Sequence, residues 1–121
     1  MREEMLSATL NELNGSSADI EASGIISTDG LMMASVLPAN LDEDRVGAMS
    51  AAMLSLGDRT AQELARGTLE QVLIKGDSGY VLMTYAGDEA VLTVLAKPNA
   101  KLGLIFLDVK RAAEKIAEQL S

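Results

Sequence analysis

Residues 25–31 read Ile25-Ile26-Ser27-Thr28-Asp29-Gly30-Leu31, with an Asp-Gly pair close behind one apolar run and directly before another. This pair is a strong short-range signal for a β-hairpin, because a two-residue type I′ turn requires positive φ at both central residues. The sequence therefore predicts a strand over residues 19–28, a turn at Asp29-Gly30 and a second strand over residues 31–37. Pro38 follows and ends the second strand, since proline has no N–H to donate to a neighbouring strand.

A long helix is predicted next, from Asp42 to about Arg66. Asp42 suits the N-cap position, and Gly67 is expected to end the helix. Gly57 inside it costs about 1 kcal/mol relative to alanine, which indicates a bend or a close packing contact. The middle of the helix contains residues too small to fill a core alone, namely Ala48, Ser50, Ala51, Ala52 and Ser55. We therefore expect another surface to approach this helix closely, which favours a contact surface over a catalytic pocket.

The remaining elements follow from the periodicity of the apolar residues. A leucine stripe predicts a first helix over residues 2–14, with Gly15 as its left-handed C′ residue. Three strands and a closing helix are predicted over residues 69–75, 80–86, 90–96 and 100–120. The strands over 80–86 and 90–96 are apolar on both faces, as central strands are, whereas polar residues place the 69–75 strand at an edge. The whole chain, residues 1–121, is predicted to form a single domain.

Composition excludes several classes of function. A net charge of −8 and three aromatic residues argue against nucleic acid as a partner. No apolar run approaches the roughly 18 residues of a membrane span, so direct membrane insertion is not expected. An anionic membrane is expected to repel the chain, so that peripheral attachment would need a partner. The chain has no cysteine, and its start lacks the features of a secretory signal, which together favour a cytoplasmic location.

The sequence also lacks the usual catalytic equipment. It has no histidine, no cysteine, no phosphate-binding loop and no dinucleotide fingerprint, so we expect no enzyme activity, no cofactor and no metal. The acidic pairs Asp42/Asp44 and Asp88/Glu89 are interpreted as helix capping and as a solvated turn. Most of the methionines are interpreted as core residues, with Met49 and Met53 as the exceptions, because methionine is common on adaptable protein-binding surfaces.

The order of the elements and several strings resemble the Roadblock / dynein light chain family, in particular its bacterial MglB-like branch. The resemblance lies in the hairpin 25–31 with Ala34-Ser35, the alanine-rich helix, the stretch 69–74 and the string 100–104. It implies an α+β fold with a five-stranded antiparallel sheet of strand order 2-1-5-4-3. The first and third helices are then expected on one face and the second helix on the other.

The resemblance also implies a homodimer, in which the second helices pack together and the third strands pair. The residues expected at this dimer interface are Ala48, Ala52, Ser55, Leu69, Gln71 and Leu73. The residues expected to contact a partner protein are Met49, Met53 and Leu56. An alternative left open by the residues alone is that Ala48, Ala52 and Ser55 face the chain's own sheet.

The function implied by the resemblance is a non-enzymatic regulator or scaffold that binds a Ras-like small GTPase. In the MglB-like branch the dimer stimulates its GTPase by reshaping the partner's own active site. A second hypothesis is a small-molecule sensor or adaptor module in a signalling complex, since helix-flanked sheets of this size also bind ligands.

Overall fold

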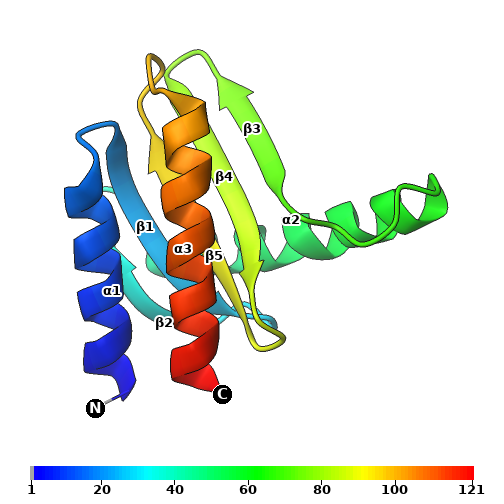
Figure 1. Ribbon diagram of the computed structural model, residues 1–121, viewed down its shortest axis with the longest axis horizontal. Coiled ribbons are helices and arrows are strands. Elements are labelled where there is room, and N and C mark those ends of the chain that lie inside the picture. The colour runs from blue at the N-terminus through cyan, green and yellow to red at the C-terminus, as the bar shows by residue number, and fades with distance from the viewer. Residues whose placement is uncertain (1) are drawn as a thin grey trace.

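A five-stranded antiparallel sheet lies between helices on its two faces (Figure 1). The computed structural model describes residues 2–121. The strand order is β2-β1-β5-β4-β3, as predicted. Along the chain the elements are α1 (Arg2–Ser16), β1 (Ile20–Ser27), β2 (Met32–Val36), α2 (Glu43–Glu63), β3 (Val72–Gly76), β4 (Gly79–Ala86), β5 (Ala90–Ala96) and α3 (Leu102–Leu120).

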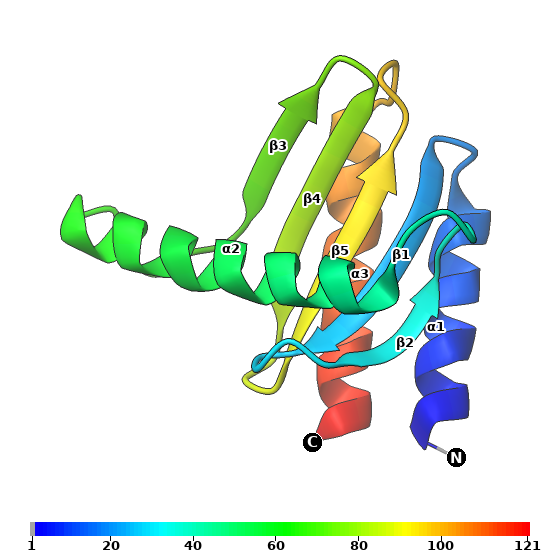
Figure 2. The same ribbon diagram turned by 180° about the vertical axis from the view of Figure 1, so that it is seen from behind.

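The helices divide between the two faces as the family resemblance implies. Helices α1 and α3 run side by side along one face (Figure 1), and α2 crosses the other face at a large angle to the strands (Figure 2). Strands β1, β5 and β4 are central, whereas β2 and β3 each pair with one neighbour only and form the two edges. None of the helices within residues 2–121 is long and apolar enough to span a bilayer.

Side-chain alternation along the central strands builds a core on each side of the sheet. On the α1/α3 side, Leu82 and Leu92 join the buried faces of both helices in the larger cluster. On the α2 side, the smaller cluster consists of Ile26, Leu54, Met83 and Val91. The sheet is therefore apolar on both faces, which explains the continuous hydrophobic runs of β4 and β5.

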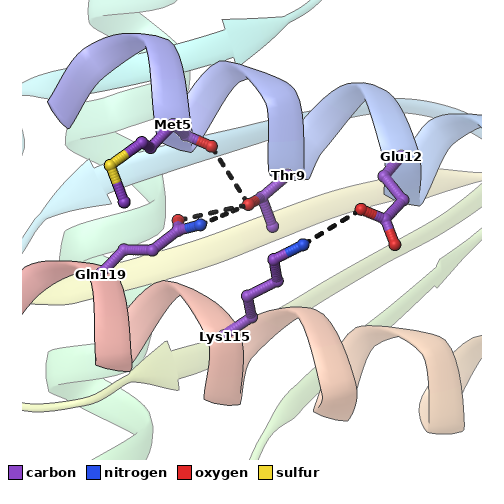
Figure 3. A network of polar contacts seen from close by, with 5 residues as sticks. All are labelled: Met5, Thr9, Glu12, Lys115 and Gln119. Carbon is purple, nitrogen blue, oxygen red and sulfur yellow. Dashed lines mark hydrogen bonds and ion pairs between the residues drawn. The ribbon is translucent and has the colours of Figure 1, made fainter. Parts of the chain in front are cut away.

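Polar contacts connect α1 to α3 above the larger core (Figure 3). Gln119 Nε2 donates a hydrogen bond to Thr9 Oγ1 (3.0 Å), and Thr9 Oγ1 donates one to the carbonyl oxygen of Met5 (3.1 Å). Lys115 Nζ lies 3.1 Å from Glu12 Oε2, although both side chains are largely exposed, so this ion pair contributes little stability. The two helices are held mainly by their buried apolar stripes.

The hairpin turn differs from the type I′ prediction. Gly30 has φ +96°, but Asp29 does not have positive φ. The N–H of Gly30 bonds to the carbonyl of Ser27 (2.9 Å), and the pairing register shifts between Ile25 and Ile26. These features describe a three-residue loop with Thr28 and Asp29 at the centre of the turn and Gly30 in the left-handed position. The Asp-Gly pair therefore predicted the position of the hairpin correctly. The prediction of positive φ is right for Gly30 and wrong for Asp29.

Helix ends and one strand start also differ from the prediction. Helix α1 continues through Gly15 to Ser16, whose hydroxyl donates to the carbonyl of Leu13 (2.7 Å) and so satisfies a terminal acceptor without a left-handed glycine. Helix α2 ends at Glu63 rather than near Arg66, and β3 starts at Val72 rather than at Leu69. The shorter helix and strand leave an irregular segment, residues 64–71, between them.

Candidate functional site

The surface formed by α2 and β3 contains the residues that the sequence analysis selected. Helix α2 begins at a capped end, because Asp42 Oδ1 accepts hydrogen bonds from the N–H groups of Asp44 (2.9 Å) and Arg45 (3.4 Å). At Gly47 the helix meets the β1–β2 hairpin so closely that an added Cβ would lie 2.6 Å from the carbonyl oxygen of Gly30. Only glycine allows this approach, and it sets the position of the N-terminal part of α2 on the sheet.

Further along α2, small residues keep the helix close to the sheet. Thr93 Oγ1 donates a buried hydrogen bond of 2.8 Å to Ser50 Oγ, which joins β5 to α2. Leu54, one turn on, is buried in the smaller core. A Cβ at Gly57 would lie 3.0 Å from Val72 Cγ2, so the predicted packing contact of Gly57 is confirmed. The stripe Gly47, Ser50, Leu54 and Gly57 therefore faces the sheet.

The opposite side of α2 is exposed. Ala48, Ala52 and Ser55 all face solvent, so the alternative that they pack on the chain's own sheet is wrong. The physical reason is that Gly47 and Ser50 already occupy the close contacts with the hairpin and β5. Met49 is 53% exposed and Leu56 60% exposed, whereas Met53 is half-buried and packs partly against the smaller core. Met53 therefore contributes to the core as well as to the surface.

Strand β3 adds a second exposed apolar element. It pairs with β4 only, so the backbone N–H and C=O groups on its other edge have no strand partner within the described residues. Leu73 is 40% exposed on this strand, and Ile74 beside it is exposed as well. Gln71 is exposed just before the strand, whereas Leu69 is half-buried and packs against the smaller core. Gln71 and Leu69 thus lie outside the strand to which they were assigned.

A shallow apolar groove joins the two elements. Figure 2 shows the C-terminal part of α2 projecting beyond the β3 edge of the sheet, with the chain returning behind the helix to β3. The groove between helix and returning chain has a volume of about 420 Å³. Its lining includes Met53, Leu56, Leu64, Leu69, Gln71 and Val72. Residues assigned separately to the dimer interface and to partner binding therefore meet in one groove.

The sequence did not predict two exposed residues of this surface, Leu64 and Ile74. Leu64 lies at the C-cap of α2, two turns beyond Leu56, and the spacing of eight residues could have placed it on the same face. Ile74 faces the α2 side of β3, since its partner in the register is Val81, which packs on the smaller core. Side chains two residues apart on a strand point to the same face, so the position of Val72 could have predicted that Ile74 lies on the α2 side.

The returning chain is held to α2 by Asp58. Asp58 Oδ1 accepts a hydrogen bond from the N–H of Leu69 (3.5 Å), and Oδ2 accepts one from Gln62 Nε2 (3.3 Å). Burial, and secondly the negative charge of Asp58, raise the pKa of the nearby Tyr85 phenol. The raised pKa keeps the phenol protonated to higher pH, and Tyr85 packs against the smaller core.

Apolar and small side chains, rather than titratable ones, make up most of this surface. Within residues 2–121 no group of three or more acidic side chains lies close enough to hold a metal ion. Every buried side-chain nitrogen and oxygen of the described residues has a hydrogen-bond partner. The arrangement instead consists of exposed apolar side chains, small residues and an open strand edge, which are features of a protein contact surface.

Residues 6–96 match the model of the Roadblock/LC7 domain. The chain belongs to the Roadblock/LC7 family. An uncharacterised relative from Methanocaldococcus jannaschii, MJ1340, is 46% identical over 112 residues, covering 93% of this chain and 96% of the relative. The family assignment agrees with the sheet order and the placement of α2 already described.

Solved structures of this family share the fold of the Roadblock/LC7 chain. A Roadblock/LC7 domain from Streptomyces avermitilis superimposes with a TM-score of 0.88 at 20% identity, covering 94% of this chain and 96% of the other. The gliding protein MglB from Thermus thermophilus superimposes with a TM-score of 0.87 at 20% identity, covering 98% of this chain and 90% of the other. At these identities the likeness shows the fold alone.

Proposed function

We propose that this Roadblock/LC7 protein is a homodimeric regulator or scaffold that binds a Ras-like small GTPase. The observation that carries the proposal is the apolar surface of α2 and of the adjoining face of β3, where Met49, Leu56, Leu64 and Ile74 are exposed. Leu73 is exposed on the other face of β3, since its register partner Leu82 lies in the larger core. Monomeric proteins rarely leave so many large apolar side chains on one surface. The choice of a small GTPase as partner rests on the resemblance of the sequence to the MglB-like branch of the family.

The roles divide along the surface. The open edge of β3, with Leu73, and the small exposed residues of α2, Ala48, Ala52 and Ser55, form the dimer interface, with Gln71 and Leu69 at its margin. Pairing of β3 with its copy satisfies the free backbone groups of the edge, and small residues let two copies of α2 approach closely. Met49, Met53 and Leu56 contact the GTPase.

The partner is recognised through its nucleotide state. A regulator shifts an equilibrium only through a difference in affinity between the two states, so the protein binds either the GDP form or the GTP form more tightly. The protein supplies no phosphate-binding loop, so nucleotide is held by the GTPase alone. Stimulation of GTP hydrolysis, where it occurs, then comes from reshaping the partner's own site.

The test is a titration of fluorescently labelled Ras-like GTPases from the same organism, loaded with GDP or with a GTP analogue. We expect tighter binding to one nucleotide state and a loss of at least about tenfold in affinity for Met49→Asp, which places a charge in a desolvated contact. Met5→Asp is the matched control, because Met5 is also exposed but lies on α1. Equal affinity for both nucleotide states would show that the protein is a scaffold rather than a regulator. If the protein bound none of the organism's Ras-like GTPases, the proposal would be wrong.

A further inference from the structure

The start of α3 and the loop before it form a basic surface on the face opposite α2 (Figure 1). We call this surface the α3 patch and define it as Lys97, Lys101, Leu104, Leu107, Lys110 and Arg111, all of them exposed. The proposed function uses none of these residues. They lie on and beside the first turns of one helix, so they form a continuous surface.

Two large apolar side chains stand at the centre of the α3 patch. Leu104 is 61% exposed and Leu107 45% exposed. The buried stripe of α3 begins with Ile105 and Val109, so Leu104 and Leu107, three residues apart, project away from the sheet. The two leucines therefore contribute nothing to the core, and they lie on the convex outer surface of the helix rather than in a groove.

The charge of the chain is distributed unevenly around these leucines. Residues 97–111 contain four basic side chains and one acidic one, a net charge of +3. The rest of the chain contains six basic and seventeen acidic side chains, a net charge of −11. The chain as a whole is acidic, but this region is positive, so the expectation that an anionic membrane repels the chain does not apply to this surface.

The cations of the α3 patch are free to meet an external anion. Within the described residues, Lys97, Lys101, Lys110 and Arg111 form no ion pair. Two nearby carboxylates accept hydrogen bonds within the fold, since Asp19 Oδ2 accepts from the backbone N–H of Lys101 (3.2 Å) and Asp108 Oδ2 accepts from Ser16 Oγ (3.3 Å). The exposed Glu114 lies one helical turn after Lys110 but forms no salt bridge with it. The patch thus presents unpaired positive charge around exposed leucine.

We propose that the α3 patch docks on the surface of a membrane that contains anionic lipids. Basic side chains flanking a few exposed apolar residues bind the headgroup region through charge and shallow apolar burial. A convex helix surface fits a flat, deformable layer better than it fits a peptide, which needs a groove. Screening limits interactions to roughly 8 Å at physiological salt, so the local charge outweighs the distant acidic residues.

Docking through the α3 patch orients the molecule. Helices α1 and α3 then face the membrane, and α2 with its exposed residues faces away from it (Figures 1 and 2). A partner bound to α2 would be held beside the membrane without competing for the same surface. The inference goes beyond the proposed function and needs no GTPase for its test, so failure of one leaves the other standing.

The test is flotation of the purified protein with vesicles of phosphatidylcholine alone or mixed with phosphatidylglycerol. We expect binding to the mixed vesicles only, with affinity that falls as salt rises. Lys101→Glu should lower the affinity about fivefold or more, whereas Arg45→Glu, the same charge change on α2, should not. Leu104→Gln should weaken binding, whereas Leu31→Gln, the same change at an exposed leucine of the β1–β2 hairpin beside α2, should not.

Three results would overturn the proposal. The first is absence of binding to the mixed vesicles at low salt. The second is an equal effect of Lys101→Glu and Arg45→Glu, which would indicate a response to net charge alone. The third is binding of polyglutamate as tight as binding of vesicles and insensitive to Leu104→Gln, which would assign the patch to an acidic protein instead.

Discussion

At the scale of single residues, Ala65 is the clearest departure from ordinary backbone preference. It has φ +58° and is the only non-glycine residue with positive φ among residues 2–121. It occupies the C′ position of a Schellman motif, in which its own N–H bonds to Gln62 (3.1 Å) and that of Arg66 bonds to Ala61 (2.7 Å). Glycine usually fills this position, because a Cβ is strained there.

Ala65→Gly should therefore stabilise the protein by about 0.5–1 kcal/mol, after the greater chain entropy of glycine in the unfolded state is subtracted. Ala61→Gly, one turn earlier in the same helix, removes the same methyl group from a helical position and should cost about 1 kcal/mol. Urea denaturation of both variants measures the two effects. A loss of stability in both would show that the left-handed backbone at Ala65 carries no strain.

At the scale of elements, the packing of α2 against the β1–β2 hairpin decides which residues the helix exposes. Gly47→Ala places a Cβ 2.6 Å from the carbonyl oxygen of Gly30, which is backbone and has little room to yield. We expect a cost of about 1–2 kcal/mol from this overpacking, even though alanine favours the helix. The free energy of unfolding in urea gives the value.

Gly15→Ala is the matched control for this effect. Gly15 lies in α1, and a Cβ there meets no atom within 4 Å. The same chemical change should therefore stabilise the protein by about 0.5–1 kcal/mol through helix propensity alone. Opposite signs for the two glycines are the expected outcome, and stabilisation by Gly47→Ala would mean that α2 can move off the hairpin freely.

At the scale of the whole molecule, the prediction concerns self-association. The protein should have twice its single-chain mass of 12.7 kDa at micromolar concentration, because dimerisation covers the β3 edge and the small face of α2. Ala52→Glu buries an unpaired charge in that interface and Leu73→Lys opposes strand pairing, so each should weaken the dimer at least about tenfold. Light scattering across a concentration series reports the mass.

Ala8→Glu serves as the control for self-association, because Ala8 is exposed on α1, away from the proposed interface. It should leave the dimer intact. If the wild type stayed monomeric across the accessible range, the dimer would be wrong. If both interface variants kept the wild-type mass, the dimer would form through another surface.

Local patterns in the sequence were sufficient to predict the order of the elements along the chain, the central strands β4 and β5, the edge strand β3 and the hairpin position. Amphipathic stripes such as Leu6, Leu10 and Leu13, and the two-sided apolar strands β4 and β5, report which faces are buried without knowledge of the neighbours. The sheet order and the placement of the helices came from the family resemblance. Both were confirmed by the structure.

The tertiary structure alone decided which side of α2 faces the sheet and where the helix ends. Glycine, alanine and serine provide little hydrophobic contrast, so periodicity cannot distinguish Gly47 and Ser50, which pack inward, from Ala48 and Ala52, which are exposed. That choice depends on contacts distant in sequence, the approach of Gly47 to Gly30 and the hydrogen bond between Ser50 and Thr93. Patterns of neighbouring residues cannot predict such contacts, because residues distant in sequence meet only once the chain has folded.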